Sequence, residues 1–496
     1  MKLLLTHGYF LRLDEKQWSL QEPYPPLATL YAASELKREG FEVIIQDPMF
    51  EKSTDFLNHA IIQNRPELVI IYDDVFNYLT KMCTTVMRNA VFDMIEIAKM
   101  NKLICVIAGS DASDHPDMYL KQGADFIIKG EGEKTVSELV RAIAERKENW
   151  KAIPGICFME GDRMIKTESR PVMKELDKLG LPDWDSIDLK PYVQAWKKKS
   201  GYLSLNISTT RGCPFHCNWC AKPIYGNRYH VHSPEYTLNQ INKLQKVFGA
   251  EHFWITDDIF GLKPGWTSRF AELVSESGAR FRYKIQSRAD LLCKEGTVKE
   301  LAGSGCETVW IGAESGSQKI LDAMDKGIRV EQIYEANKLL RKHGIRPAFF
   351  LQFGYPGEDM NDINLTIKML EELMPEDIGI SISYPLPGTV FHDKVKEELS
   401  NKANWTDSDD LDLMFQNTYP AEFYKNLQRY IHRRYRSRQA LRYIGKALKK
   451  PFRIKAPELL SMCKAPAYIA GSIYYKRKLL RNTRDSNISF KESDES

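Results

Sequence analysis

The chain has 496 residues, of which 43% are hydrophobic and 27% are charged, and its formal net charge is +4. This length allows two to four domains, and the composition is typical of a folded globular protein rather than a disordered or fibrous one. Residues 1–7 contain too short an apolar run for a signal peptide, and no segment reaches the roughly 20 apolar residues that span a membrane.

Residues 1–150 alternate short β-rich runs with helical patterns. The predicted strands are 2–6, 42–46, 68–72, 103–108 and 125–128, and the predicted helices are 27–39, 55–62, 84–100 and 133–146. This alternation predicts an α/β domain with a doubly wound parallel sheet, whose ligand binds at the carboxyl ends of the strands. Residues 151–200 are polar and punctuated by proline, so we expect a connector there.

A second alternating series occupies residues 201–400. Its predicted strands are 203–208, 252–256, 281–286, 307–312, 347–353 and 378–384, and its predicted helices are 235–248, 267–277, 296–303, 330–343 and 361–373. Six strands with intervening helices predict a partial (β/α)6 barrel. The active site of such a barrel collects at the carboxyl ends of its strands.

Residues 401–484 are predicted to be helical and basic, and the acidic, serine-rich residues 485–496 to be disordered. Between 425 and 455 there are twelve Lys or Arg and no Asp or Glu. One helical face should pack on the barrel through Leu427, Tyr430, Ile431, Tyr435, Leu441, Ile444, Leu448 and the stem of Arg434. The opposite face should either attract an anionic membrane or be an ordinary solvated surface, and it carries Arg429, Arg433, Arg436, Arg442, Lys446 and Lys449.

Six of the nine cysteines are scattered along the chain without the regular spacing of a disulfide framework, and most of the six lie inside apolar runs. They are Cys83, Cys105, Cys157, Cys293, Cys306 and Cys463. Isolated cysteines in apolar surroundings are typical of buried thiols rather than of disulfides. We therefore expect a reducing, cytoplasmic compartment.

The other three cysteines lie in the stretch Arg-Gly-Cys-Pro-Phe-His-Cys-Asn-Trp-Cys at 211–220, directly after the first predicted strand of the barrel. Cys213, Cys217 and Cys220 have the spacing C-x3-C-x2-C, one thiolate short of the four that fill an iron–sulfur cluster. One iron would then be open to a small molecule. The alternative is a zinc site whose fourth ligand is His216, His230 or His232, but zinc sites usually have paired C-x2-C knuckles.

This spacing, with an aromatic residue before the last cysteine, resembles the signature of the radical S-adenosylmethionine (SAM) enzymes. In that family the three cysteines ligate a [4Fe-4S] cluster, and the methionine end of SAM chelates the fourth iron. The resemblance covers roughly residues 200–390. It implies that an electron cleaves SAM to methionine and a 5′-deoxyadenosyl radical, which abstracts hydrogen from an unactivated C–H bond.

Polar residues after the second strand match positions with which the family binds SAM. Asp257 and Asp258, in the sequence Thr-Asp-Asp-Ile-Phe, are joint candidates to receive the SAM amino group. A helix cap or a surface ion pair is the alternative for these two carboxylates.

Later strand ends add four more candidates. The third strand ends in Gln-Ser-Arg, which contains Ser287 and Arg288, and Glu314 ends the fourth. The resemblance implies that Glu314 reaches the SAM ribose and that Arg288 meets the SAM carboxylate, unless the two form a structural ion pair. Gly354, after the fifth strand, would let the backbone approach adenine or substrate, or would only shape a turn.

The first domain resembles the cobalamin-binding domain of one large radical SAM subfamily, through the stretches 25–36, 106–110 and 123–133. The chain lacks the D-x-H-x-x-G motif that supplies a histidine to cobalt, so cobalamin should bind without one. Gly109 is followed by Ser110 where many relatives have a second glycine. Loss of the cofactor from a retained fold is therefore the alternative.

Together these resemblances imply a radical SAM methyltransferase or oxidative cyclase, similar to the anaerobic Mg-protoporphyrin ester cyclases and hopanoid-modifying enzymes. The expected substrate is a secondary metabolite, lipid or cell-surface precursor, and the expected electron donor is a flavodoxin or ferredoxin. The alternative of another class is a zinc-containing nucleic-acid-binding or RNA-modifying protein whose basic run, 425–455, binds phosphates. Nucleic acid is not the expected partner, because the first domain lacks a second set of three cysteines.

Overall fold

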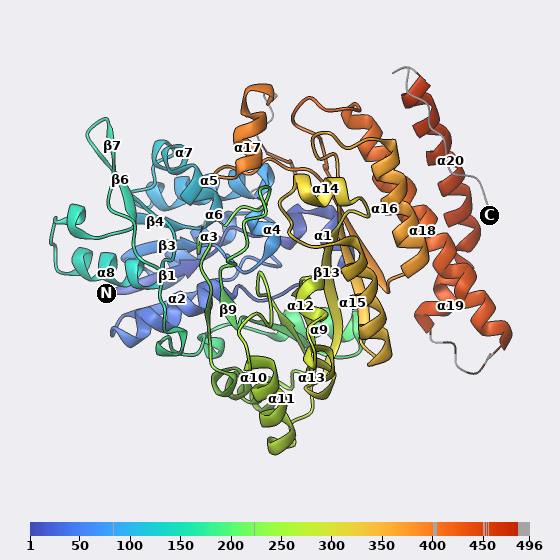
Figure 1. Ribbon diagram of the computed structural model, residues 1–496. Coiled ribbons are helices and arrows are strands. Elements are labelled where there is room, and N and C mark those ends of the chain that lie inside the picture. Colours follow the sequence, from blue (N-terminus) through green and yellow to red (C-terminus); the bar gives the residue numbers. More distant parts are fainter. Residues whose placement is uncertain are drawn as a thin grey trace.

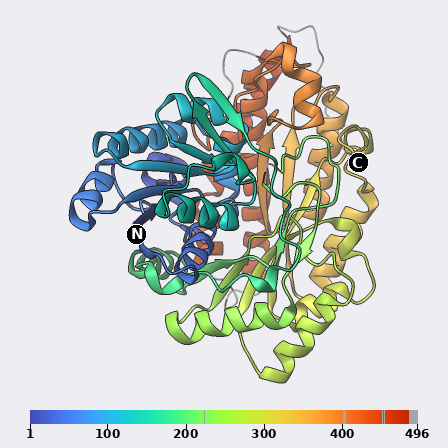
Figure 2. The ribbon, with the colours of Figure 1, turned by 90° about the vertical axis from the view of Figure 1, so that its left-hand side faces the viewer.

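Two mainly parallel sheets with helices packed on them lie side by side, and three further helices flank the second sheet (Figures 1 and 2). The computed structural model describes residues 1–82, 84–222, 224–399, 404–449, 452, 454 and 456–484. The predictions for Cys83 and for residues 485–496 concern positions outside the described residues.

The amino-terminal sheet has the strand order β2-β1-β3-β4-β5-β6-β7, with parallel pairing from β2 to β5. This is the order of a doubly wound fold, as predicted. Both faces of the sheet are covered, which is why its strands are continuously apolar. The parallel strands are β1 (Lys2–Thr6), β2 (Glu42–Ile45), β3 (Leu68–Tyr72), β4 (Ile104–Ala108) and β5 (Phe126–Ile128), and the principal helices are α2 (Leu27–Arg38), α3 (Asp55–Asn64), α5 (Thr85–Met100) and α8 (Glu133–Ala144).

An antiparallel hairpin of β6 (Ile156–Glu160) and β7 (Arg163–Lys166) completes this sheet. The boundary expected at residue 150 thus falls inside the sheet, and part of the expected connector belongs to the first domain. The hairpin covers the edge of β5, whose backbone groups would otherwise be unpaired. The rest of the connector includes α9 (Lys190–Ser200) and leads to the barrel.

The second sheet contains six parallel strands in the order β8-β11-β12-β13-β14-β15, which confirms the partial barrel. A short antiparallel pair, β9 (Thr210–Arg211) and β10 (His230–Val231), brackets the cysteine stretch. The barrel strands are β8 (Ser204–Ile207), β11 (His252–Ile255), β12 (Arg282–Ser287), β13 (Cys306–Glu314), β14 (Arg346–Phe353) and β15 (Asp377–Ile382), and the main helices are α10 (Pro234–Phe248), α11 (Trp266–Ser277), α13 (Thr297–Gly303), α15 (Val330–Lys342) and α16 (Met360–Leu373).

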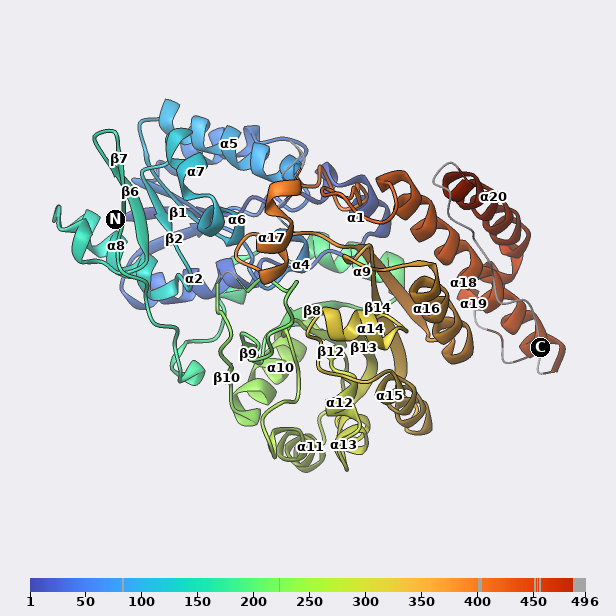
Figure 3. The ribbon, with the colours of Figure 1, turned by 45° about the horizontal axis from the view of Figure 1, so that its top comes forward.

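The C-terminal region consists of α18 (Ala421–Lys449), α19 (Ala456–Cys463) and α20 (Ala465–Arg484). Leu427, Tyr430, Ile431 and Tyr435 of α18 are buried, so the predicted inward face is confirmed in this half of the helix. It is wrong further along, where Leu441 and Leu448 are exposed. The reason is that the barrel does not extend beneath the last turns of α18 (Figure 3).

The predicted outward face of α18 is solvated only in part. Arg436 pairs with Asp377 of the barrel at 2.6 Å, and Lys446 pairs with Glu458 of α19 at 2.6 Å. Arg429, Arg433, Arg442 and Lys449 are exposed, as expected. These acidic partners, Asp377 and Glu458, lie outside the basic run. The run itself contains no Asp or Glu, so its sequence did not indicate that some of its cations are paired. None of the described helices is both long and apolar enough to cross a bilayer.

Candidate cluster and cofactor site

The three cysteines lie on one loop that follows β8 and β9 and ends before β10. Cys213, Cys217 and Cys220 are partly exposed, and their thiols are close enough to influence one another electrostatically. Burial, followed by the neighbouring Asp258 carboxylate, raises the pKa of the Cys220 thiol to about 12. Because a metal centre binds the thiolate form, cluster assembly must release these protons.

In the described chain, no three His, Cys, Asp or Glu side chains gather closely enough to hold a single metal ion. A structural zinc site requires four such ligands converging on one point. The three thiols instead form an incomplete set on an open loop. This donor set suits a [4Fe-4S] cluster with one iron left for SAM.

Asn218, between the second and third cysteines, anchors the loop. Its backbone N–H donates to Met324 O at 3.0 Å, and its side-chain amide donates to Ala323 O at 2.7 Å, at the end of α14 (Gln318–Ala323). The Tyr355 hydroxyl donates to Asn218 Oδ1 at 2.7 Å, and Phe391 N–H of α17 (Val390–Val395) donates to Asn218 O at 2.9 Å. The Asn218 side chain is therefore a buried brace that fixes two of the three ligands in space.

The start of the loop is fixed by close packing. Gly212 has φ +78°, and a Cβ there would lie 2.3 Å from the carbonyl oxygen of Arg228, so no other residue fits without a backbone shift. The Lys222 ammonium, beyond the last cysteine, donates to the carbonyl oxygen of Phe215 and to Asn227 Oδ1. These contacts hold the loop against the segment that leads into β10.

Asp257 and Asp258 occupy different environments. Asp257 is 1% exposed and accepts hydrogen bonds from the backbone N–H groups of Thr209 (2.7 Å) and Thr210 (2.9 Å), which tie β11 to the turn before the cysteine loop. Burial raises the pKa of Asp257 to about 7, although these hydrogen bonds favour its carboxylate. Asp258 is exposed and lies near the Cys213 and Cys220 thiols. The geometry thus gives Asp257 a structural role and leaves Asp258 beside the cluster loop.

Glu314 ends β13 with a φ of +56°, a conformation that is uncommon for a residue other than glycine. Its carboxylate pairs with the ammonium of Lys326 at 2.7 Å, and both side chains are buried. Burial disfavours the charge of Lys326, but Glu314 and the Cys217 thiol raise the pKa of Lys326 above its ordinary value. Sequence reasoning missed Lys326, because nothing in the local Asp-Lys-Gly turn distinguishes it from a surface lysine.

The expected alternative of an Arg288–Glu314 ion pair is wrong. Arg288 pairs with Asp290 at 2.9 Å and donates to Lys326 O at 2.7 Å, while its guanidinium carbon lies 3.7 Å from the centre of the Phe215 ring. Phe215 belongs to the cysteine loop. Asp290, in the first turn of α12 (Ala289–Leu292), is the carboxylate that Arg288 reaches, and Glu314 pairs with Lys326 instead. Arg288 therefore supports the loop from the barrel side.

The two remaining predicted residues lie at strand ends but face protein groups. Ser287 is buried and donates to Phe260 O at 3.4 Å. Gly354 has φ +77°, and a Cβ there would lie 3.3–3.4 Å from Tyr424 of α18 and from Leu413. The close approach that Gly354 permits is thus to the C-terminal region.

Arg211 of β9 joins the cluster loop to the amino-terminal domain. Its guanidinium is 3% exposed and pairs with Glu133 at 2.6 Å and with Glu131. The Tyr31 and Tyr225 rings lie 5.5 Å and 5.2 Å from the guanidinium carbon. The acidic stretch that resembles a cobalamin-binding motif therefore also forms the contact between the two domains.

The carboxyl ends of β1, β3 and β4 form the crevice where a doubly wound sheet binds its ligand. Thr6 and Ser110 lie at this edge, and in the described chain their hydroxyls are buried without a hydrogen-bond partner. Unpaired buried hydroxyls are costly unless a ligand satisfies them, and the amide side chains of a corrin ring can do so. The donor chemistry of the crevice thus fits cobalamin.

His7 is unsuited to bind cobalt. It is 1% exposed, its Nε2 lies 2.9 Å from Asp47 Oδ1, and its Nδ1 accepts from the N–H of Tyr9 at 3.2 Å. His115 is half-buried, and burial lowers its pKa.

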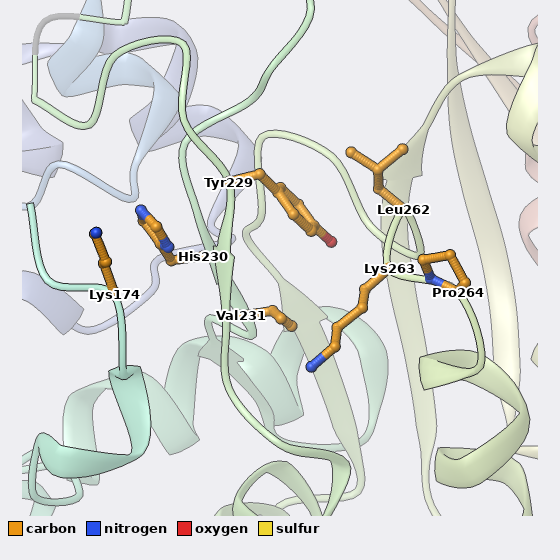
Figure 4. A pocket seen from close by; sticks show the side chains of 7 residues that line it. All are labelled: Lys174, Tyr229, His230, Val231, Leu262, Lys263 and Pro264. Atoms are coloured by element: carbon orange, nitrogen blue, oxygen red, sulfur yellow. The ribbon is translucent and has the colours of Figure 1, made fainter.

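A cavity of about 420 Å³ lies beside the cluster loop (Figure 4). Tyr229 points toward Leu262 and Lys263 of the loop after β11, whereas His230 points to the other side of its strand, next to Lys174 of the connector. Lys174 and Lys263 are exposed, and neither pairs with a carboxylate of the described chain. Burial, and then the charges of Arg228 and Lys174, lower the pKa of His230. The cavity therefore carries two exposed cations in its lining.

The two domains match known families. The radical SAM superfamily profile matches residues 207–370, and the B12-binding domain profile matches residues 19–140. Both matches coincide with the domains described above. The chain is therefore a radical SAM enzyme with an amino-terminal B12-binding domain. These two domains imply a [4Fe-4S] cluster, SAM and cobalamin as cofactors.

Among similar proteins, the uncharacterized methyltransferase PH0819 of Pyrococcus horikoshii is 28% identical over 77% of this chain and 81% of its own length. The hopanoid C-3 methylase of Methylococcus capsulatus is 26% identical over 78% of this chain and 69% of the methylase. The anaerobic magnesium-protoporphyrin IX monomethyl ester cyclase of Cereibacter sphaeroides is 23% identical over 76% of this chain, and the match covers 61% of the cyclase.

One solved structure has the same fold over the whole chain. The cobalamin-dependent S-adenosylmethionine radical enzyme OxsB, with aqua-cobalamin bound, superposes with a TM-score of 0.73 and 17% identity over 100% of this chain and 77% of OxsB. This likeness shows the fold, and the two profile matches confirm the class predicted from the cysteine loop. The alternative of a zinc-containing nucleic-acid-binding protein is not supported by these matches.

Proposed function

We propose that this enzyme methylates an unactivated carbon of a secondary metabolite, lipid or cell-surface precursor. The observation that carries the proposal is the Arg211 contact, which lies two residues before Cys213 and ties the cluster loop to the B12-binding domain. Methyl transfer with two cofactors requires that they be held in one fixed arrangement. The similarity to methyltransferases of this class supports the same reaction type.

When bound, the cluster and SAM supply hydrogen abstraction, and cobalamin supplies a methyl group. The chain's own residues bind and orient these groups. Cys213, Cys217 and Cys220 would hold the cluster, Asp258 would receive the SAM amino group, and the Glu314–Lys326 pair would present a fixed dipole beside the SAM site. Ser287, Arg288 and Gly354 would act through the shape of the site rather than through direct contact.

Ring closure is the second candidate, because a cyclase is among the similar proteins. Cells fed methionine with an isotopically labelled methyl group distinguish the two reactions. Methylation predicts a product that carries the label and depends on the wild-type gene, whereas ring closure predicts an unlabelled product that has lost hydrogen. A Cys217→Ala strain should make neither product, and a Cys293→Ala strain should behave as wild type. Labelled product in the Cys217→Ala strain would refute the proposal.

We also propose that an acidic electron-transfer protein, of the flavodoxin or ferredoxin type, docks at the cavity lined by Lys174 and Lys263. The positive charge of this cavity and the closeness of Tyr229 to Cys213 support that placement. The double variant Lys174→Glu/Lys263→Glu should slow flavodoxin-driven SAM cleavage about tenfold or more, and leave dithionite-driven cleavage unchanged. Equal flavodoxin rates in wild type and variant would exclude this docking site.

The proposed compartment is the reducing cytoplasm, which the five described cysteines outside the cluster loop support, since none of them forms a disulfide in the described chain. Finally, we propose that the enzyme makes peripheral contact with an anionic membrane. Such contact would bring a lipid or other apolar substrate close to the active site.

A further inference from the structure

Large apolar side chains are concentrated on the surface of the C-terminal helices. Of the sixteen that are exposed in the described chain, eight lie between positions 441 and 474. Leu448 is 82% exposed and Phe452 is fully exposed. No residue of α19 is buried, although its sequence is Ala-Pro-Glu-Leu-Leu-Ser-Met-Cys. An apolar surface of this density marks an interaction site rather than ordinary solvent-facing residues.

The inner face of α20 is already occupied. Tyr468 and Tyr475 lie about 6 Å from the guanidinium groups of Arg433 and Arg429 on α18, and Leu479 is fully buried. Gly471 lets the helix approach α18, because a Cβ there would meet the Arg433 side chain at 3.1 Å. The remaining face of α20 therefore points away from the protein, on the outer side of α18 (Figures 1 and 3).

That outer face is apolar near its start and basic near its end. Ile469, Ile473 and Tyr474 are 39%, 50% and 54% exposed, and Leu459 and Leu460 of the adjoining α19 are 54% and 56% exposed. From 464 to 484 the chain has no Asp or Glu, and its six cations are Lys464, Lys476, Arg477, Lys478, Arg481 and Arg484. An apolar helix face next to a group of Lys and Arg side chains is typical of helices that lie in a membrane interface.

We infer that the outer faces of α19 and α20 form a docking surface for an anionic lipid bilayer. The charge of these helices decides between occupants. A second copy of the chain would bring the same cations face to face, whereas anionic headgroups neutralise them while the acyl region takes up the apolar side chains. The surface lies on the interface without crossing it, because no described helix is long and apolar enough to span a bilayer.

This surface differs from the one expected on α18, whose cations are partly paired with Asp377 and Glu458 or lie against α20. The inference rests on the membrane contact proposed above and gives it a place on the molecule. It is independent of the proposed reaction, because binding to vesicles is measured without turnover.

Sedimentation of the whole protein with vesicles tests the inference. Binding to phosphatidylglycerol vesicles should exceed binding to phosphatidylcholine vesicles about tenfold at low salt, and high salt should weaken it. Ile473→Asp/Tyr474→Asp should abolish the binding, and so should Arg477→Glu/Arg481→Glu, which reverses two exposed cations. Val247→Asp, which changes an exposed apolar residue of α10, should leave it intact.

Two results would overturn the inference. One is equal, salt-insensitive sedimentation with both vesicle types, or binding that survives both double variants. The other is a wild-type protein that does not bind vesicles but forms a dimer in light scattering, if Ile473→Asp/Tyr474→Asp dissociates that dimer. The occupant of the surface would then be a second copy of the chain.

Discussion

The guanidinium of Arg211 lies 2.6 Å from a carboxylate oxygen of Glu133, across the contact between the barrel and the B12-binding domain. Both side chains are buried, at 3% and 2% exposure. A buried ion pair of this kind contributes little net stability, but removal of one partner leaves an uncompensated charge. The pair therefore specifies how the two domains are placed.

Arg211→Met should lower the free energy of unfolding by about 3–5 kcal/mol, because Glu131 and Glu133 would remain buried and unpaired. Thermal denaturation measures this change. Arg269→Met is the matched control, since Arg269 pairs with Glu235 at the surface, and its loss should leave the melting temperature close to that of the wild type. Equal losses in the two variants would show that the interdomain pair has no special role.

Asn218→Ala should cost about 1–3 kcal/mol and reduce the iron retained per chain, because it removes the amide that ties the loop to the Ala323 carbonyl and the Tyr355 hydroxyl, which keep only their hydrogen bond to each other. Tyr355→Phe should have a smaller effect, about 1 kcal/mol. His216→Ala, at an exposed position of the same loop, should retain wild-type iron. Full iron content in Asn218→Ala would contradict the bracing role.

Asp258→Asn should weaken SAM binding by about ten- to a hundredfold while the absorption spectrum of the cluster is unchanged, since one charge-assisted hydrogen bond is lost. Asp257→Asn should instead lower the melting temperature, because Asp257 accepts from two backbone N–H groups. Calorimetric titration with SAM on anaerobically reconstituted protein separates these outcomes. Unchanged affinity for SAM in Asp258→Asn would show that this carboxylate does not bind SAM.

Glu358 predicts a pH dependence of stability. Its side chain is fully buried, one oxygen accepts from Gly354 N–H at 2.6 Å, and burial raises its pKa to about 8. Because the folded pKa lies above the unfolded value, the group favours folding at low pH, and this contribution is lost as the pH rises from about 4.5 to about 8. Glu358→Gln should flatten the melting temperature over this range, whereas exposed Glu331→Gln should not.

Cobalamin should bind with no histidine of this chain on the cobalt. His115→Ala should leave the absorption spectrum of the bound corrinoid unchanged. Thr6→Val and Ser110→Ala should reduce the amount of corrinoid retained after anaerobic purification, because their hydroxyls are buried without partners in the described crevice. A spectral change in His115→Ala would identify it as a ligand.

The sequence alone predicted both sheets, because strand and helix periodicities are local properties of the chain. The strands of both domains fall within a few residues of their expected positions. The cysteine spacing likewise predicted the cluster loop, since all three ligands lie within eight consecutive residues, 213–220. The β6–β7 hairpin was missed because its polar outer residues hide the alternation of a short edge strand.

Only the tertiary structure decided which side chains act together. Lys326 is 12 residues from Glu314, Tyr355 is 137 residues from Asn218, and Arg211 is 78 residues from Glu133. The structure likewise separated Asp257 from Asp258, which the sequence treats as equivalent neighbours, and covered part of the basic helix with α20. Residue types and periodicity are read along the chain, whereas burial and pairing depend on which distant segments the fold brings into contact.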